Sequence, residues 1–145
     1  MHREERTVDM EDRLDIARRV QYHTKFLQQI AKSTADVDIT SNLEEVKRSL
    51  HFIAAHGEMA KGNAAAATAR IFARTKDDET RRMCLDSLSR IHSTKATNEL
   101  LRISQNTDVD QTLRDLANEY LRDGGRRTQP IAVTISGTPI AVGQP

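Results

Sequence analysis

Aromatic side chains are scarce in this chain of 145 residues: they make up 3% of it, and tryptophan is absent. A buried core must therefore be built mostly from alanine, leucine, isoleucine and valine. That composition is common in helical repeats, where small side chains let neighbouring helices approach closely. The shortage also leaves few rings on which unpaired nucleotide bases could stack, which counts against single-stranded nucleic acid as the ligand.

Cysteine is nearly missing as well, since Cys84 is the only one. One cysteine excludes an intrachain disulfide and suits a reducing compartment. Cys84 lies between Met83 and Leu85 on an apolar helix face. We therefore expect a small buried residue there rather than a reactive thiol.

Long apolar runs and a strong net charge are also absent. No segment is apolar over the length that a membrane helix needs. Residues 1–6 carry charges of both signs without a following apolar segment, which is unlike a secretory signal. The formal net charge is +1, which gives no general attraction to nucleic acid or to an anionic membrane. These observations predict a cytoplasmic protein without membrane contact.

What the chain does contain is helical periodicity. Apolar residues recur every three or four positions in six successive segments, which predicts an all-α fold. Three helices are expected over about residues 12–32, 41–57 and 59–74, the second opened by a capping box of Ser41 and Glu44. Three more should follow, each after a capping residue: Asp77 or Asp78, then Ser93 or Thr94, then Asp108 or Asp110.

A short pattern occurs twice within these helices. Residues 80–88 match residues 113–121, with Arg81 and Arg114 at the same place and a step of 33 residues between them. This step is typical of a helix-turn-helix repeat. A unit so short cannot bury its own apolar faces, so it has to stack on a neighbour. The pattern therefore predicts a short helical solenoid.

The same stretches resemble HEAT-like repeats of the bacterial kind. Residues 80–88 carry the acidic opening, arginine, small residues and leucine of that family's first helix; residues 113–121 are a looser copy, and residues 46–50 a weaker one with Lys47 at the arginine position. The resemblance covers roughly residues 42–121. It implies a right-handed α–α superhelix in which the second helix of each pair lines a concave face that binds other proteins.

On this basis the chain divides into three parts. Residues 1–33 are expected to form an N-terminal capping helix, and residues 42–123 the HEAT-like repeats. The second helix should pair with the third and the fourth with the fifth, while the sixth lacks a partner. Residues 124–145 contain Pro-Ile-Ala-Val twice, and three alternatives remain open for them: an extended mobile tail, a strand docked on a partner, or a cover over the last helix.

Catalytic and metal-binding patterns are not found in the sequence. His51 and His56 are five residues apart and diverge around a helix, unlike the i, i+4 pair of zinc-binding helices. The serines lack a nucleophile elbow, and no glycine-rich loop has a phosphate-binding ending. Carboxylates cluster at helix starts, where capping explains them. We therefore expect no catalysis, no metal and no cofactor.

The candidate binding residues are four cations, which lie on the helices expected to line the concave face: Arg70, Arg74, Lys95 and Arg102. Such a strip could hold an acidic segment of another protein, or phosphates. The alternative is a solvated face, partly neutralised by Glu99. For Arg81 and Arg114 we expect a structural role, in which they pair with capping aspartates across adjacent repeats.

The sequence thus favours a non-catalytic protein–protein interaction scaffold built from HEAT-like repeats. One alternative is nucleic-acid binding through the same basic strip, which the near-neutral charge and the few aromatic rings disfavour. Another is an accessory subunit of a modifying enzyme, such as a pigment lyase.

Overall fold

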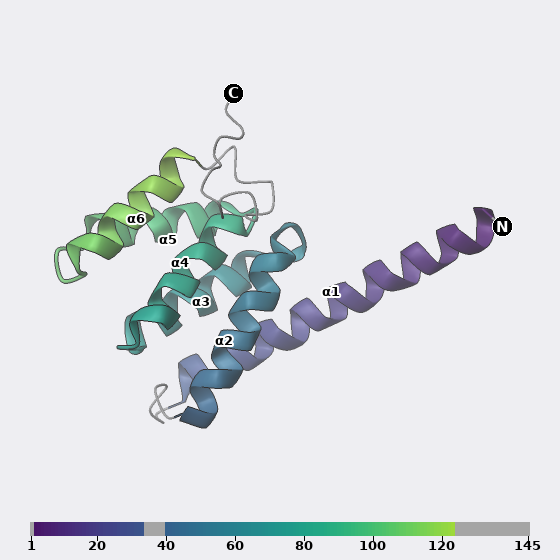
Figure 1. Ribbon diagram of the computed structural model, residues 1–145, viewed down its shortest axis with the longest axis horizontal. Coiled ribbons are helices and arrows are strands. Elements are labelled where there is room, and N and C mark those ends of the chain that lie inside the picture. Colours follow the sequence, from purple (N-terminus) through teal and green to yellow (C-terminus); the bar gives the residue numbers. More distant parts are fainter. Residues whose placement is uncertain (1, 34–39, 124–145) are drawn as a thin grey trace.

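Six α-helices and one short 3-10 helix make up the part of the chain that the computed structural model describes, which is residues 2–33 and 40–123. The all-α fold class is confirmed for these residues (Figure 1). The elements are α1 (His2–Lys32), α2 (Thr40–Ala55), η1 (Gly57–Met59), α3 (Gly62–Arg74), α4 (Asp78–Arg90), α5 (Thr94–Gln105) and α6 (Gln111–Arg122). The expected tail, residues 124–145, and most of the connector between α1 and α2 lie outside the described residues.

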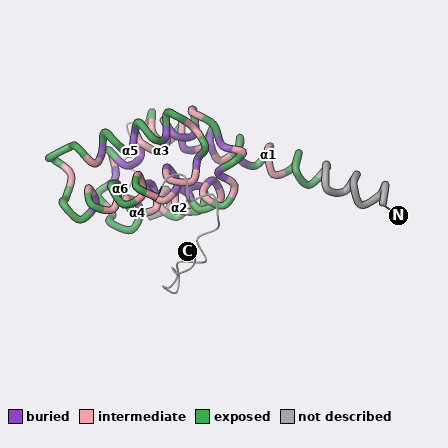
Figure 2. The backbone as a smooth tube through the Cα atoms, turned by 90° about the horizontal axis from the view of Figure 1, so that it is seen from above, coloured by how far each residue is buried: buried purple, intermediate pink, exposed green. Residues whose placement is uncertain are grey.

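The helices form two layers. In one layer α3 packs between α1 and α5, and in the other α4 packs between α2 and α6. Contacts between α1 and α2, α3 and α4, and α5 and α6 join the layers. Figure 2 shows α3 and α5 on one side and α2, α4 and α6 on the other, with the buried stretches between them. The exposed side of the α1–α3–α5 layer is therefore one continuous face made by alternate helices.

This packing differs from the pairing expected from the sequence. The second helix packs mainly on α1 and α4 rather than on the third helix, whereas α4 does contact α5 as expected. The first helix packs on both α2 and α3. Val20 and Leu27 of α1 are buried and belong to the same apolar core as the later helices. The N-terminal half of α1 extends away from the other helices (Figure 1).

The caps of α4 and α5 follow the prediction and decide between its alternatives. Asp77 caps α4 and its carboxylate accepts the Thr80 N–H, and Ser93 caps α5 and accepts the Lys95 N–H. Asp110 occupies the capping position of α6, but its carboxylate accepts no cap hydrogen bond. The first turns of α4 and α5 are thus tied down by side chains, which fixes where each helix begins.

Two helix starts were predicted wrongly. α1 begins at His2 rather than near Asp12, because charged residues dominate its first ten positions and no apolar stripe reveals the helix there. α3 begins at Gly62 rather than Met59, because residues 57–59 form the 3-10 turn and Ala60 is extended. The turn at Gly57 brings the end of α2 against the end of α4, where a Cβ would collide with the Arg90 carbonyl.

Small residues allow the close packing of α3. Ala64, Ala65 and Ala67 are buried on its inner side, together with Ile71 and Phe72.

Cys84 is buried on α4 as predicted, and burial raises the pKa of its thiol, so the reactive thiolate is disfavoured. Among residues 2–33 and 40–123, none of the helices combines the length and the apolar character required to cross a bilayer.

Candidate partner-binding groove

A groove of about 590 Å³ opens between α3 and α5, beside the loops that lead into α4 and α6. Of the described residues that line it, five are basic and two acidic, a formal excess of three positive charges. The basic residues are Arg70, Lys76, Arg81, Lys95 and Arg102, and the acidic ones are Glu99 and Asp108. Three of the four cations predicted from the sequence therefore meet in one groove.

The floor of this groove is apolar. Ala66, Ala69 and Ala73 of α3 contribute only methyl groups, which leaves the space between the two helices open. Phe72 and Ile103, both buried, close the bottom of the groove. A groove with an apolar floor and charged walls can bury aliphatic parts of a ligand while its walls bind the charged parts.

Glu99 is a buried carboxylate in the wall of the groove, with 6% of the residue exposed. Its Oε2 lies 2.9 Å from Lys95 Nζ and its Oε1 lies 3.9 Å from Arg102 Nη1. The partial neutralisation by Glu99 that the sequence suggested is therefore present. It does not remove the basic character of the groove, since Arg102 remains 72% exposed and has donors that face water.

Arg74 lies apart from the other three predicted cations. Its Nη1 donates hydrogen bonds of 2.6 and 2.9 Å to the carbonyl oxygens of Ile30 and Ala31, near the C-terminus of α1. The Ile30 carbonyl also accepts from the Ser33 N–H at 3.2 Å, and carbonyls at the C-terminus of a helix are favourable acceptors for a guanidinium. Arg74 joins α3 to α1 and is not among the residues that line the α3–α5 groove.

Arg81 lines the groove, although the sequence suggested only a structural role for it. Its Nη2 donates to the Lys76 carbonyl oxygen at 3.1 Å and lies 3.5 Å from an Asp78 carboxylate oxygen. Its Nε is buried and has no hydrogen-bond acceptor among the described residues. Arg81 and Lys76 were missed as site residues because they belong to α4 and to the loop before it, outside the helices expected to line the concave face.

The expected pairing of Arg81 and Arg114 with aspartates across repeats is wrong. Arg114 Nε donates to the Val109 carbonyl at 2.9 Å, so each arginine bonds the backbone five residues before it, in the loop that leads into its own helix. The cross-helix pairing is made instead by Lys47 on α2, which contacts Glu79 at 2.8 Å and Asp77 at 3.8 Å. Hydrogen bonding to Glu79 raises the pKa of Lys47.

A second groove, of about 220 Å³, lies between α1 and α3 on the same face. Ala66 and Arg70 line both grooves. The other residues around the smaller groove are largely uncharged, with Gln28 and Asn63 supplying side-chain amides and Lys32 a positive charge. The two grooves are therefore neighbours on either side of α3, with different chemistry.

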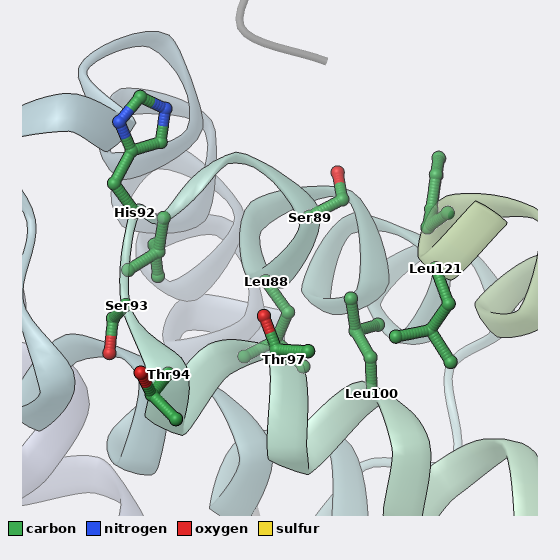
Figure 3. A pocket seen from close by; sticks show the side chains of 10 residues that line it. Leu88, Ser89, His92, Ser93, Thr94, Thr97, Leu100 and Leu121 are labelled. Atoms are coloured by element: carbon green, nitrogen blue, oxygen red, sulfur yellow. The ribbon is translucent and has the colours of Figure 1, made fainter. Parts of the chain in front are cut away.

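A further cavity, of about 350 Å³, lies between the end of α4, the start of α5 and the end of α6. Leu88, Leu100 and Leu121 line it together with the hydroxyls of Ser89 and Thr97 (Figure 3). His92 is the one histidine among the described residues that line it. The described lining thus mixes apolar side chains with hydroxyls and one imidazole, and contains no aspartate, glutamate, lysine or arginine.

Metal-ligand geometry is not present in the described ranges. No group of three or more histidine, cysteine, aspartate or glutamate side chains in them could hold a metal ion. His23 contacts Ser49 through Nδ1 and stacks near Phe52, which places it between α1 and α2. His51 is exposed on α2.

The chain matches no family model, no curated protein and no solved structure.

Proposed function

We propose that the chain is a non-catalytic interaction module of HEAT-like type that binds an acidic segment of another protein in its α3–α5 groove. The observation that carries the proposal is the clustering of five basic side chains around an apolar floor, against two carboxylates. One of these carboxylates, Glu99, already has Lys95 and Arg102 beside it. An acidic peptide would find donors that remain available on Arg70 and Arg102, both exposed.

A protein segment accounts for the groove better than nucleic acid does. The basic residues lie around one groove of limited volume, whereas a nucleic-acid backbone needs an extended track of phosphate contacts. The described lining includes Phe72 as its single aromatic residue, and that ring is 6% exposed. Stacking of bases in the groove is therefore not supported. We also propose a cytoplasmic setting, which the single buried thiol suits.

Binding can be tested with a fluorescein-labelled hexapeptide of alternating aspartate and glutamate, measured by fluorescence anisotropy. The matched probe has asparagine and glutamine at the same places. We expect the acidic peptide alone to bind, and its affinity to fall with added salt because exposed charges are screened. An oligonucleotide that bound while the acidic peptide did not would overturn the proposal.

Two charge reversals locate the site. The double variant Arg70→Glu with Arg102→Glu changes exposed groove residues and keeps Lys95 beside Glu99. It should lower the affinity for the acidic peptide about tenfold or more. The control, Arg82→Glu with Arg122→Glu, makes the same change in net charge on exposed residues of α4 and α6. Equal losses in the two double variants would place the peptide elsewhere, and unaltered thermal unfolding establishes that both remain folded.

A further inference from the structure

The two grooves beside α3 share a border at Ala66 and Arg70. At Ala66 only a methyl group projects from α3 between the two grooves, and this residue is half-buried. Arg70 stands one helical turn further on, exposed, and faces both grooves. A chain that leaves one groove can therefore pass over α3 at Ala66 into the other, with a cation next to its path.

The chemistry changes along this path. On the α5 side the groove is basic, as described above. On the α1 side Gln28 and Asn63 offer amide donors and acceptors, Ala31 and Ala67 add apolar surface, and Lys32 adds a positive charge. Side-chain amides pair with the N–H and C=O groups of an extended peptide backbone, which do not depend on the identity of its side chains.

We propose that the bound segment is an extended peptide of another protein that crosses α3 over Ala66, with its acidic residues in the α3–α5 groove and a neutral flank in the α1–α3 groove. This inference rests on the proposed function and adds the length, conformation and composition of the ligand. Packed helices lie about 8–10 Å apart, so the step across α3 from one groove to the other is also about 8–10 Å. An extended chain covers this step with about three residues, at about 3.3 Å each.

A helical ligand does not suit this surface. An α-helix with side chains is about 10–12 Å across, whereas the passage at Ala66 is a low point on α3 with Arg70 beside it. An extended chain also exposes its backbone groups to the amides of Gln28 and Asn63, which a helix would bond internally.

The test compares three labelled peptides: the acidic hexapeptide alone, and the same peptide extended by four neutral residues (Ala-Ser-Ala-Asn) at its N-terminal or its C-terminal end. We expect at least one of the two extended peptides to bind about tenfold more tightly than the hexapeptide, because its added residues reach the α1–α3 groove. Equal affinity of all three peptides would overturn the crossing. The proposed function would still hold in that case if the acidic hexapeptide bound and its asparagine–glutamine counterpart did not.

Bulky substitutions then locate the flank. Asn63→Trp, in the α1–α3 groove alone, should remove the gain from the extension and leave the hexapeptide affinity within about twofold. Ala66→Trp should remove the gain as well, because it raises the crossing point. Asn118→Trp, exposed on α6, is the matched control and should retain the gain. A gain that survives both Asn63→Trp and Ala66→Trp in folded protein would contradict the path proposed here.

Discussion

The backbone of Gly57 packs so closely on Arg90 that a Cβ at residue 57 would lie 1.9 Å from the Arg90 carbonyl oxygen. The His92 N–H donates to the Gly57 carbonyl at 3.3 Å in the same place. This contact joins the end of α2 to the end of α4. The glycine is thus required by a tertiary approach between two helix ends.

Gly57→Ala should therefore destabilise the fold. Relief of the overlap needs a backbone shift, and overpacking of this kind costs about 1–3 kcal/mol in the free energy of unfolding. Urea unfolding followed by circular dichroism measures the loss. The control is Gly62→Ala, where the added Cβ would lie 3.6 Å from Lys95 Cβ, an ordinary contact. If the two variants were equally stable, the contact with Arg90 would not be restrictive.

Arg74→Met should lower stability without changing peptide binding. It removes both hydrogen bonds to the carbonyls of Ile30 and Ala31, and their loss should cost about 1–2 kcal/mol. Thermal unfolding and anisotropy with the acidic hexapeptide measure the two effects separately. Arg82→Met, exposed on α4, should alter neither quantity. A loss of peptide affinity in folded Arg74→Met protein would show that Arg74 also contributes to peptide binding.

Asp77→Ala should be more damaging than Asp110→Ala. Asp77 Oδ2 accepts hydrogen bonds from the Thr80 N–H at 3.0 Å and from the Thr80 hydroxyl at 2.7 Å, whereas Asp110 makes no cap hydrogen bond. Loss of the Asp77 cap should cost about 1 kcal/mol. Urea unfolding of the two variants under identical conditions makes the comparison. Costs that do not differ would show that the Thr80 hydrogen bonds add nothing.

The contribution of Asp77 to the stability of the fold should depend on pH. Hydrogen bonds from Thr80 hold the pKa of Asp77 below its ordinary value of 3.8. The charged carboxylate therefore stabilises the fold fully above that value, and the stabilisation is lost as the pH falls through the lowered pKa. The difference in stability between the native chain and Asp77→Ala should accordingly be constant near neutral pH and shrink in acid.

His23 should make the α1–α2 packing sensitive to mild acid. Burial lowers its pKa from 6.5, with Arg19 and Arg48 acting in the same direction and Glu45 opposing them. Because the folded state binds the proton less readily than the unfolded state, stability is complete above pH 6.5 and falls as the pH drops through the lowered pKa. Unfolding free energies measured between pH 7.5 and 5 should show this fall.

Substitution identifies the group responsible. His23→Gln keeps an amide within reach of Ser49, whose Oγ lies 2.8 Å from the histidine Nδ1, but cannot titrate. It should flatten the dependence on pH. His51→Gln, at an exposed histidine, should leave it as in the native chain. A slope that His23→Gln left intact would assign the pH dependence to other groups.

Local signals in the sequence were sufficient for the helices of the C-terminal half. Aspartate and serine caps together with regular apolar spacing placed the starts of α4 and α5, since Asp77 and Ser93 bond the first turns of their own helices. The packing partners were not predictable in the same way. Whether α2 packs on α3 or on α1 depends on the direction in which each loop leaves its helix, and apolar periodicity contains no information about that direction.

The candidate site was predicted in part for a similar reason. Arg70 and Arg74 are one turn apart on α3, yet Arg70 reaches the groove and Arg74 bonds the end of α1. Long flexible side chains choose among partners on neighbouring elements, so their helix position alone does not decide their contacts. Arg81 was excluded from the predicted site because it lies on α4, although its side chain extends toward the neighbouring loop and lines the groove.

The two-layer arrangement also bears on how the chain folds. Each helix that packs substantially on another does so on its neighbour in the chain or the next but one. Only short loops must close before each contact forms, so contact order is low and folding should be fast, on the microsecond-to-millisecond scale of helical bundles. Structure can then spread from a nucleus of any three successive helices to the next. A stopped-flow trace should accordingly show one fast refolding phase.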